Sequence, residues 1–145
     1  MADRYKVLGQ LYADPGATWY KLYQVPPPMD PVNTTTLAGA NIVQTLVSKI
    51  IVCAPDAGTA FTITVEPDQD FNAAGPFTPA ADTAMYFLTA IASAETIVLT
   101  PGLVLPGDQG DQTGEETAAI FVQNSALGSG QICVTALGVE VTKNE

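Results

Sequence analysis

Apolar and polar residues alternate strictly along residues 61–66, which read FTITVE. Successive side chains of a strand point to opposite faces, so this pattern predicts a strand with one buried face. Residues 50–53 are apolar at every position, which is typical of a strand that is covered on both faces. Residues 54–59 (APDAGT) contain the proline, aspartate and glycine that favour turns. The pattern predicts an antiparallel hairpin over residues 44–66, and we expect the sheet to be built outward from it.

Further short, β-branched apolar stretches show the same strand-like character, and no segment sustains a helical period. These stretches lie at residues 18–25, 84–89, 95–100, 103–105, 117–123 and 131–142. Together with the hairpin they give about eight strands, separated by turn residues. We therefore expect one all-β domain over residues 1–145, an antiparallel β-sandwich of the jelly-roll or immunoglobulin-like kind.

The segments between these strands are expected to lie on the surface. They are an extended N-terminal arm at residues 1–10, a Pro- and Thr-rich insertion at 26–41, and long loops at 67–82 and 107–116. Proline lacks the backbone donor that a sheet ladder needs, so the Pro-rich part of the insertion is interpreted as a stiff connector. The residues expected in the core are Ile51, Cys53, Phe61, Ile63, Val65, Leu88, Ile97, Leu99, Phe121 and Val134.

The composition is rich in apolar residues and poor in charge. Hydrophobic residues make up 47% of the chain and charged residues 14%. A surface with so few charges favours residence in an assembly. Fifteen acidic residues against five basic ones give a net charge of −10. This balance argues against nucleic acid as a partner, because phosphate binding needs clustered lysine and arginine.

Neither a membrane span nor a signal peptide is expected. No apolar run approaches the roughly 20 residues that cross a bilayer, and residues 1–4 (MADR) lack an apolar segment. We therefore expect synthesis in the cytoplasm. The two cysteines, Cys53 and Cys133, both lie in apolar strand patterns and are interpreted as buried thiols. The alternative is a bridge between strands, which requires their Cα atoms to lie within about 7 Å.

The sequence contains no histidine. Catalytic Ser-His and Cys-His pairs, histidine general bases and histidine metal ligands are therefore excluded. The glycines form neither a dinucleotide-binding fingerprint nor a P-loop. We expect no enzymatic activity and no cofactor.

Two groups of carboxylates are candidates for calcium, which prefers oxygen ligands. One group lies in the loop at 107–116, and the other follows the strand at 61–66. The first group lacks the regular alternation of a calcium-binding loop. The second group has alternate spacing, but Pro67 interrupts it and no closing bidentate acid follows. Solvated acidic surface is therefore the preferred interpretation. The members of the two groups are Asp108, Asp111, Glu115 and Glu116, and Glu66, Asp68 and Asp70.

Candidate interface residues lie in four segments: the arm, the aromatic strand at 18–25, the proline connector and the loop at 67–82. The arm carries two of the five basic residues, and we hypothesise that it docks on a neighbouring subunit by strand addition. The alternative is that the arm pairs with its own domain as an edge strand. The aromatic strand could bind a sugar or a partner, although core packing is the preferred interpretation for part of it. The interface candidates are Arg4, Tyr5, Lys6, Val7, Leu8, Trp19, Tyr20, Pro27, Pro28, Phe71 and Phe77.

Two motifs carry a family resemblance. The segment YKVLGQ at residues 5–10, followed by LYQVP at 22–26, resembles the start of small structural proteins of tailed bacteriophages, notably cyanophages and other marine phages. Weaker similarities continue through residues 47–53, 59–65, 95–108 and 131–142. The sequence departs from that pattern in its Pro-rich insertion and its two long loops.

The resemblance implies a virion structural protein with a β-sandwich fold and no enzymatic role. The leading hypothesis is a capsid decoration (cement) protein that is made in the host cytoplasm and bridges capsid subunits. The expected partners are the major capsid protein or another virion protein, together with further copies of the chain as a homo-oligomer. One alternative is a tail, neck or baseplate-fibre component of the same kind of particle. Another is a carbohydrate-binding module that acts through Trp19 and Tyr20.

Overall fold

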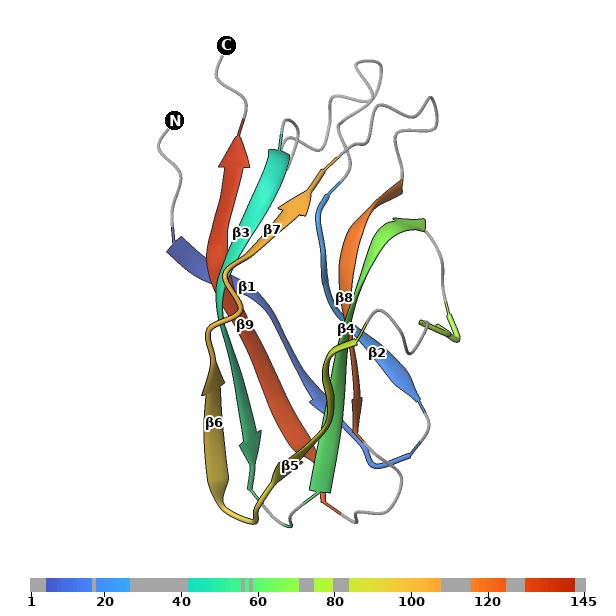
Figure 1. Cartoon of the computed structure of the whole chain (residues 1–145), viewed down its shortest axis with the longest axis vertical. Coiled ribbons are helices and arrows are strands. Elements are labelled where there is room, and N and C mark those ends of the chain that lie inside the picture. Colours follow the sequence, from blue (N-terminus) through green and yellow to red (C-terminus); the bar gives the residue numbers. More distant parts are fainter. Residues whose placement is uncertain are drawn as a thin grey trace.

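The computed structural model describes residues 5–16, 18–26, 42–55, 57, 59–70, 75–79, 84–107, 116–124 and 130–142. Within these residues the chain forms nine strands and no helix (Figure 1). The strands are β1 (Tyr5–Ala13), β2 (Trp19–Gln24), β3 (Ile42–Ala54), β4 (Thr59–Asp70), β5 (Ala84–Ile91), β6 (Glu95–Leu99), β7 (Leu103–Pro106), β8 (Glu116–Asn124) and β9 (Ile132–Thr142).

The strands form two antiparallel sheets (Figure 1). Sheet A has the order β1-β9-β3-β6, and β7 also pairs with β3. Sheet B has the order β2-β8-β4-β5. β6 and β7 share one position at the edge of sheet A, because β6 pairs with residues 50–54 of β3 and β7 with residues 44–47. Gly102 has a φ of 61°, a left-handed conformation that favours glycine, and it allows the chain to turn between these two short strands.

Almost every connection carries the chain from one sheet to the other. Only β4 to β5 and β6 to β7 stay within a sheet. Once β6 and β7 are counted as one interrupted strand, each sheet has four positions, and the first strand lies beside the last. This is the topology of a jelly roll. The all-β antiparallel sandwich expected from the sequence is confirmed.

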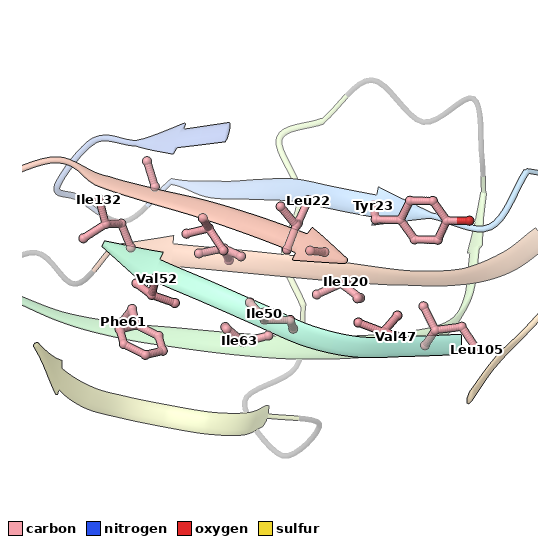
Figure 2. Packing of buried hydrophobic residues seen from close by; sticks show 14 of the residues in the cluster. Leu22, Tyr23, Val47, Ile50, Val52, Phe61, Ile63, Leu105, Ile120 and Ile132 are labelled. Atoms are coloured by element: carbon pink, nitrogen blue, oxygen red, sulfur yellow. The ribbon is translucent and has the colours of Figure 1, made fainter. Parts of the chain in front are cut away.

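The core lies between the two sheets and is built from inward-facing residues of both (Figure 2). Val47, Ile50 and Val52 of β3 face Phe61 and Ile63 of β4 across this layer, and all five are at most 1% exposed. The apolar side chains interdigitate as in other aligned sandwiches, and their burial is the main favourable term in folding.

The predicted core is correct in part. Phe61, Ile63 and Val134 are fully buried in the core, while Val65, Ile97 and Leu99 are partly buried and pack against the core cluster. Phe121 is fully buried too, but it lies outside this cluster, on the outer face of sheet B beneath Phe77. The side chain of Leu88 lies outside the described part. The prediction that Ile51 and Cys53 belong to the core is wrong. Ile50 and Val52 point inward, so the alternation of side chains along the strand turns Ile51 and Cys53 to the outer face of sheet A.

The predicted hairpin over residues 44–66 is wrong, although both of its strands exist. β3 belongs to sheet A and β4 to sheet B, and the two strands form no ladder with each other. The turn residues after Ala54 therefore carry the chain across the core from one sheet to the other. A turn signature marks where a strand ends, but it does not determine which strand becomes its neighbour.

The interpretation of residues 1–10 as an unpaired arm is also wrong for the described part. β1 pairs with β9 from Tyr5 opposite Val139 to Ala13 opposite Ile132. The structure therefore has the alternative arrangement, an edge strand of the chain's own domain. Residues 1–4 lie outside the described part.

The predicted loops are shorter than expected. Residues 67–70 continue β4, and the ladder to β8 shifts register between Glu66 and Gln69. A bulge of this kind accommodates Pro67, which has no donor for the ladder. Glu116 begins β8 rather than ending the loop that precedes it. Of the insertion at 26–41 only Pro26 is described, and residues 108–115 lie outside the described part.

Candidate functional site

The outer face of sheet A, which points away from sheet B, carries an extended set of apolar side chains. On β1 the residues Tyr5, Val7 and Tyr12 point outward and are 56%, 56% and 62% exposed. Their direct partners on β9 share that face, because opposite residues of a ladder lie on the same side of a sheet. Tyr5 is opposite Val139, and Val7 is opposite Leu137.

The same face continues over the other strands of sheet A. Leu46 lies between Val139 on β9 and Val104 on β7, and Ile51 is opposite Val98 on β6. Of the seven exposed large hydrophobic residues in the described part of the chain, six belong to this face and one, Met85, to sheet B. We call this surface the apolar face; it comprises Tyr5, Val7, Tyr12, Leu46, Ile51, Val98, Val104, Leu137 and Val139.

Two pairs of polar side chains on this face bond to each other. Gln10 Nε2 donates to Thr135 Oγ1 at 2.8 Å, and Ser48 Oγ donates to the Tyr5 hydroxyl at 2.8 Å. Lys49 is the one charged residue among the outward-facing described positions in the strands of sheet A, and none of these positions is an aspartate or glutamate. The face is therefore apolar, weakly positive and largely satisfied in its hydrogen bonding.

A polar network lies on the inner side of the same sheet. The Tyr23 hydroxyl donates to Glu140 Oε2 at 2.6 Å and lies 2.8 Å from Thr45 Oγ1. The carboxylate can only accept, so the single Tyr23 proton goes to Glu140 and Thr45 donates to the Tyr23 oxygen. Glu140 also forms an ion pair with Lys6, and its side chain is only 12% exposed.

This network raises the pKa of Tyr23 far above its ordinary value. Burial is the largest cause, because it disfavours the charged phenolate, and the hydrogen bond to Glu140 adds to it. The network connects Tyr23 on β2, an edge strand of sheet B, to three strands of sheet A. Its members in sheet A are Lys6 on β1, Thr45 on β3 and Glu140 on β9.

The two cysteines form a direct cross-strand pair. Cys53 on β3 is opposite Cys133 on β9, and both are free and partly exposed on the outer face of sheet A. Opposite residues in an antiparallel ladder have Cα atoms about 4.5–5.5 Å apart. This separation is within the range that a disulfide spans. Of the two sequence interpretations, burial in the core is wrong, and a bridge is geometrically possible.

The structure separates the interface residues predicted on β1. Tyr5 and Val7 lie on the apolar face, whereas Lys6 forms its ion pair with Glu140 and Leu8 packs against the core. The bulge between Val7 and Gly9 breaks the simple alternation here. Arg4 lies outside the described part.

Three other predicted interface residues in the described part do not lie beside Tyr5 and Val7 on the apolar face: Trp19, Tyr20 and Phe77. Tyr20 packs against the core, while Trp19, its neighbour on β2, is opposite Gln123 on the outer face of sheet B. Phe77 packs on Phe121, with ring centroids 5.0 Å apart. Phe77 therefore covers the outer face of its own sheet B. Pro27, Pro28 and Phe71 lie outside the described part.

Sequence reasoning missed most of the apolar face, notably Tyr12, Leu46, Val98 and Val104. A signal for it was present in residues 44–53, where apolar side chains occur on both faces of the strand. In a two-layer sandwich only one face of a strand meets the other sheet. A strand that is apolar on both faces therefore leaves one apolar face on the molecular surface.

The described residues contain no group of three or more cysteine, aspartate or glutamate side chains that could hold a metal ion. Of the predicted calcium candidates, Asp108, Asp111 and Glu115 lie outside the described part, and the side chains of Asp68, Asp70 and Glu116 are not described. Within the described residues, no helix is long and apolar enough to cross a bilayer.

The fold and surface define the protein as a jelly-roll β-sandwich with one exposed apolar sheet face. Neither the scan against protein-family models nor the search of curated proteins found a match. Among solved structures, the chain is similar to a chain in the "Structure of infectious bursal disease virus Gx strain", with a TM-score of 0.45 and 10% sequence identity. The match covers 98% of this chain and 38% of the viral one.

Proposed function

We propose that the protein is a non-enzymatic structural component of a virus particle, and specifically a capsid decoration protein that bridges capsid subunits. The observation that carries this proposal is the apolar face. Monomeric proteins rarely expose a large contiguous apolar patch, and such patches mark surfaces that are covered in an assembly. A protein built around such a surface acts by binding other proteins.

Two further observations support the placement on a virus particle. Jelly rolls occur in viral capsid domains, although they also occur in lectins and other proteins, so the fold supports the proposal only by analogy. The second observation is the resemblance of residues 5–10 and 22–26 to structural proteins of tailed phages.

The chemistry of the chain is consistent with a structural role. The sequence has no histidine, and the tyrosine with the most perturbed pKa, Tyr23, is enclosed by Thr45 and Glu140 between the sheets. A strongly perturbed group marks a catalytic site only where a substrate can reach it.

The carbohydrate-binding alternative is weakened by the geometry of β2. A sugar platform on this strand would need Trp19 and Tyr20 on the same surface. Tyr20 is opposite the core residue Val122, whereas Trp19 is opposite Gln123 on the other side of sheet B. A glycan array with the purified protein tests this alternative directly, and specific binding would favour it over a decoration role.

The decisive experiment is to locate the protein on purified particles. Virus particles purified from the source of the chain are imaged by electron microscopy after labelling with an antibody against the protein. A decoration protein labels the head at many positions. Labelling restricted to the tail, neck or baseplate would replace decoration with the adaptor alternative, and its absence from purified particles would overturn the proposal.

A further inference from the structure

We propose that the apolar face packs against the same face of a second copy of this chain, so that the protein is a two-fold homodimer with its two A sheets in contact. This inference deepens the proposed structural function. Dimer formation itself does not depend on that function, and only the role of the dimer in a virus particle rests on it. A two-fold interface requires a surface that is complementary to itself. A nearly uncharged sheet face meets that requirement.

The location of the carboxylates favours a second copy over other occupants. The chain has a net charge of −10, so two copies repel each other in most orientations. The outward-facing described positions in the strands of sheet A hold no carboxylate. Contact through this face therefore brings the copies together over strands whose outward-facing described positions set no carboxylate against another.

The polar groups of the face also suit a covered surface. Covering a polar side chain is costly unless it is hydrogen-bonded. Gln10 with Thr135, and Ser48 with Tyr5, already satisfy each other within one copy. A second copy can then cover them without supplying partners of its own. On a surface that always faces water, such pairing would bring little advantage, because water can bond the same groups.

The dimensions of the face match those of a stable interface. Four neighbouring strands at a spacing of about 4.8 Å, each with about nine residues rising about 3.3 Å, cover roughly 600 Å² of flat area. Side chains roughen this surface and raise its accessible area toward the roughly 800 Å² that each partner buries in an interface of standard size. Two sheets packed in this way lie about 10 Å apart.

The test is the solution mass of the full chain by sedimentation at a range of concentrations. The wild-type protein should have twice the 15.1 kDa mass of one chain. Val98→Glu places a carboxylate on the face at a position that is 54% exposed and should yield monomers. Met85→Glu is the matched control, since Met85 is an exposed hydrophobic residue on sheet B, and this variant should remain dimeric.

Cysteine reactivity gives a second readout that does not depend on any variant. Cys53 and Cys133 lie on the outer face of sheet A, so iodoacetamide should alkylate them several-fold more slowly in concentrated protein than after dilution to the monomer. The comparison of alkylation rates also tests the dimer if Val98→Glu fails to fold.

Two results would overturn the inference. One is a wild-type protein that stays monomeric at every concentration, with alkylation rates that do not depend on dilution. The other is a dimer that survives Val98→Glu but is lost in Met85→Glu, which would place the interface on sheet B. A monomer that still labels phage heads would overturn the dimer and leave the proposed function standing. A dimer that is absent from purified particles would overturn the proposed function and leave the dimer standing.

Discussion

Single buried residues connect the two sheets to each other, and Tyr23 is an example. Its ring belongs to the core, while its hydroxyl joins Thr45 and Glu140 of sheet A. Glu140 is held in a mostly buried position by this hydroxyl and by Lys6. A buried carboxylate is tolerated only when it is paired and hydrogen-bonded, so the three partners depend on one another.

The Tyr23→Phe variant should lose about 1.5–3 kcal/mol of unfolding free energy at neutral pH, since a hydrogen bond to a charged group is lost. The pH dependence provides a more specific test. The pKa of Tyr23 is raised in the folded state, so its contribution to stability is fully present below the unfolded pKa near 10. Above that pH the unfolded chain releases a proton that the folded chain retains, and stability falls by up to about 1.4 kcal/mol per pH unit.

Denaturant titrations of wild type and Tyr23→Phe between about pH 8 and about pH 11, a range that spans the ordinary tyrosine pKa, separate this contribution from that of the lysines. The two proteins should converge in stability as the pH rises above about 10. A constant difference over the whole range would contradict the assignment.

Phe61→Ala should cost about 3–5 kcal/mol, the usual range for emptying a core aromatic site. Phe61 is fully buried between the sheets, and its removal leaves a cavity that neighbouring strands cannot fill. Urea unfolding at pH 7 measures the loss. Val98→Ala, on the exposed face, is the control and should change stability by about 0.5 kcal/mol or less in the monomer. A loss below about 1 kcal/mol for Phe61→Ala would show that this site collapses or is not core.

At the scale of strands, the sequence predicts where most elements lie but not how they pair. The alternation over residues 61–66 lies within β4, the break at Pro101-Gly102 separates β6 from β7, and Phe61 and Ile63 point inward as expected. The partners of β3 are β9, β6 and β7, all distant in the sequence. Alternation identifies the two faces of a strand, whereas pairing depends on which distant strand completes the sheet.

β1 is a second example of a strand whose pairing the sequence does not predict. The two basic residues at or just before its start, Arg4 and Lys6, suggest a docking arm. Lys6 and Leu8 nevertheless both have partners inside the domain. Deleting residues 2–10 should therefore lower stability by more than about 2 kcal/mol, since Glu140 loses a charge-assisted partner and β9 loses its neighbour. Thermal and urea melts measure the loss. An unchanged melting temperature would instead support an arm that docks on a neighbouring subunit.

The pairing of β3 with β9 places the two thiols opposite each other, which leads to a redox prediction. Oxidised glutathione should convert Cys53 and Cys133 to a disulfide, with the two thiols oxidised and two molecules of reduced glutathione released. Mass spectrometry should show the loss of two hydrogens without a retained glutathione, and Cys53→Ser should instead retain one. The bridge should stabilise the protein by about 2–4 kcal/mol. A mixed disulfide on wild type would show that the two sulfur atoms cannot reach each other.

At the scale of the whole molecule, net charge and apolar surface act in opposite directions. Two copies that carry −10 each repel, while their apolar faces attract. Added salt screens the repulsion, so the homodimer should become tighter as sodium chloride is raised from about 20 to 200 mM, over which the screening length falls by about threefold. Sedimentation at a fixed protein concentration measures the shift. A dimer that dissociates with salt would indicate an ionic interface elsewhere.

The candidate site could be predicted from sequence only in outline. Tyr5 and Val7 were identified as interface candidates, but as parts of an arm rather than of a sheet face. Leu46, Val98 and Val104 become neighbours only when β3, β6 and β7 assemble. A surface made of one to three residues from each of five strands has no single local motif, because it is a property of the sheet order.

The position of β9 in sheet A has a consequence for protein synthesis. β9 is the last described strand along the chain, and it lies between β1, the first, and β3. A ribosome releases the strands in sequence order, so β1 has no partner until residues 132–142 have emerged. Nascent chains that crowd on one messenger RNA therefore lack a complete outer surface on this sheet, and premature association between them is limited. The apolar face is completed only when β9, the last of the described strands, has emerged.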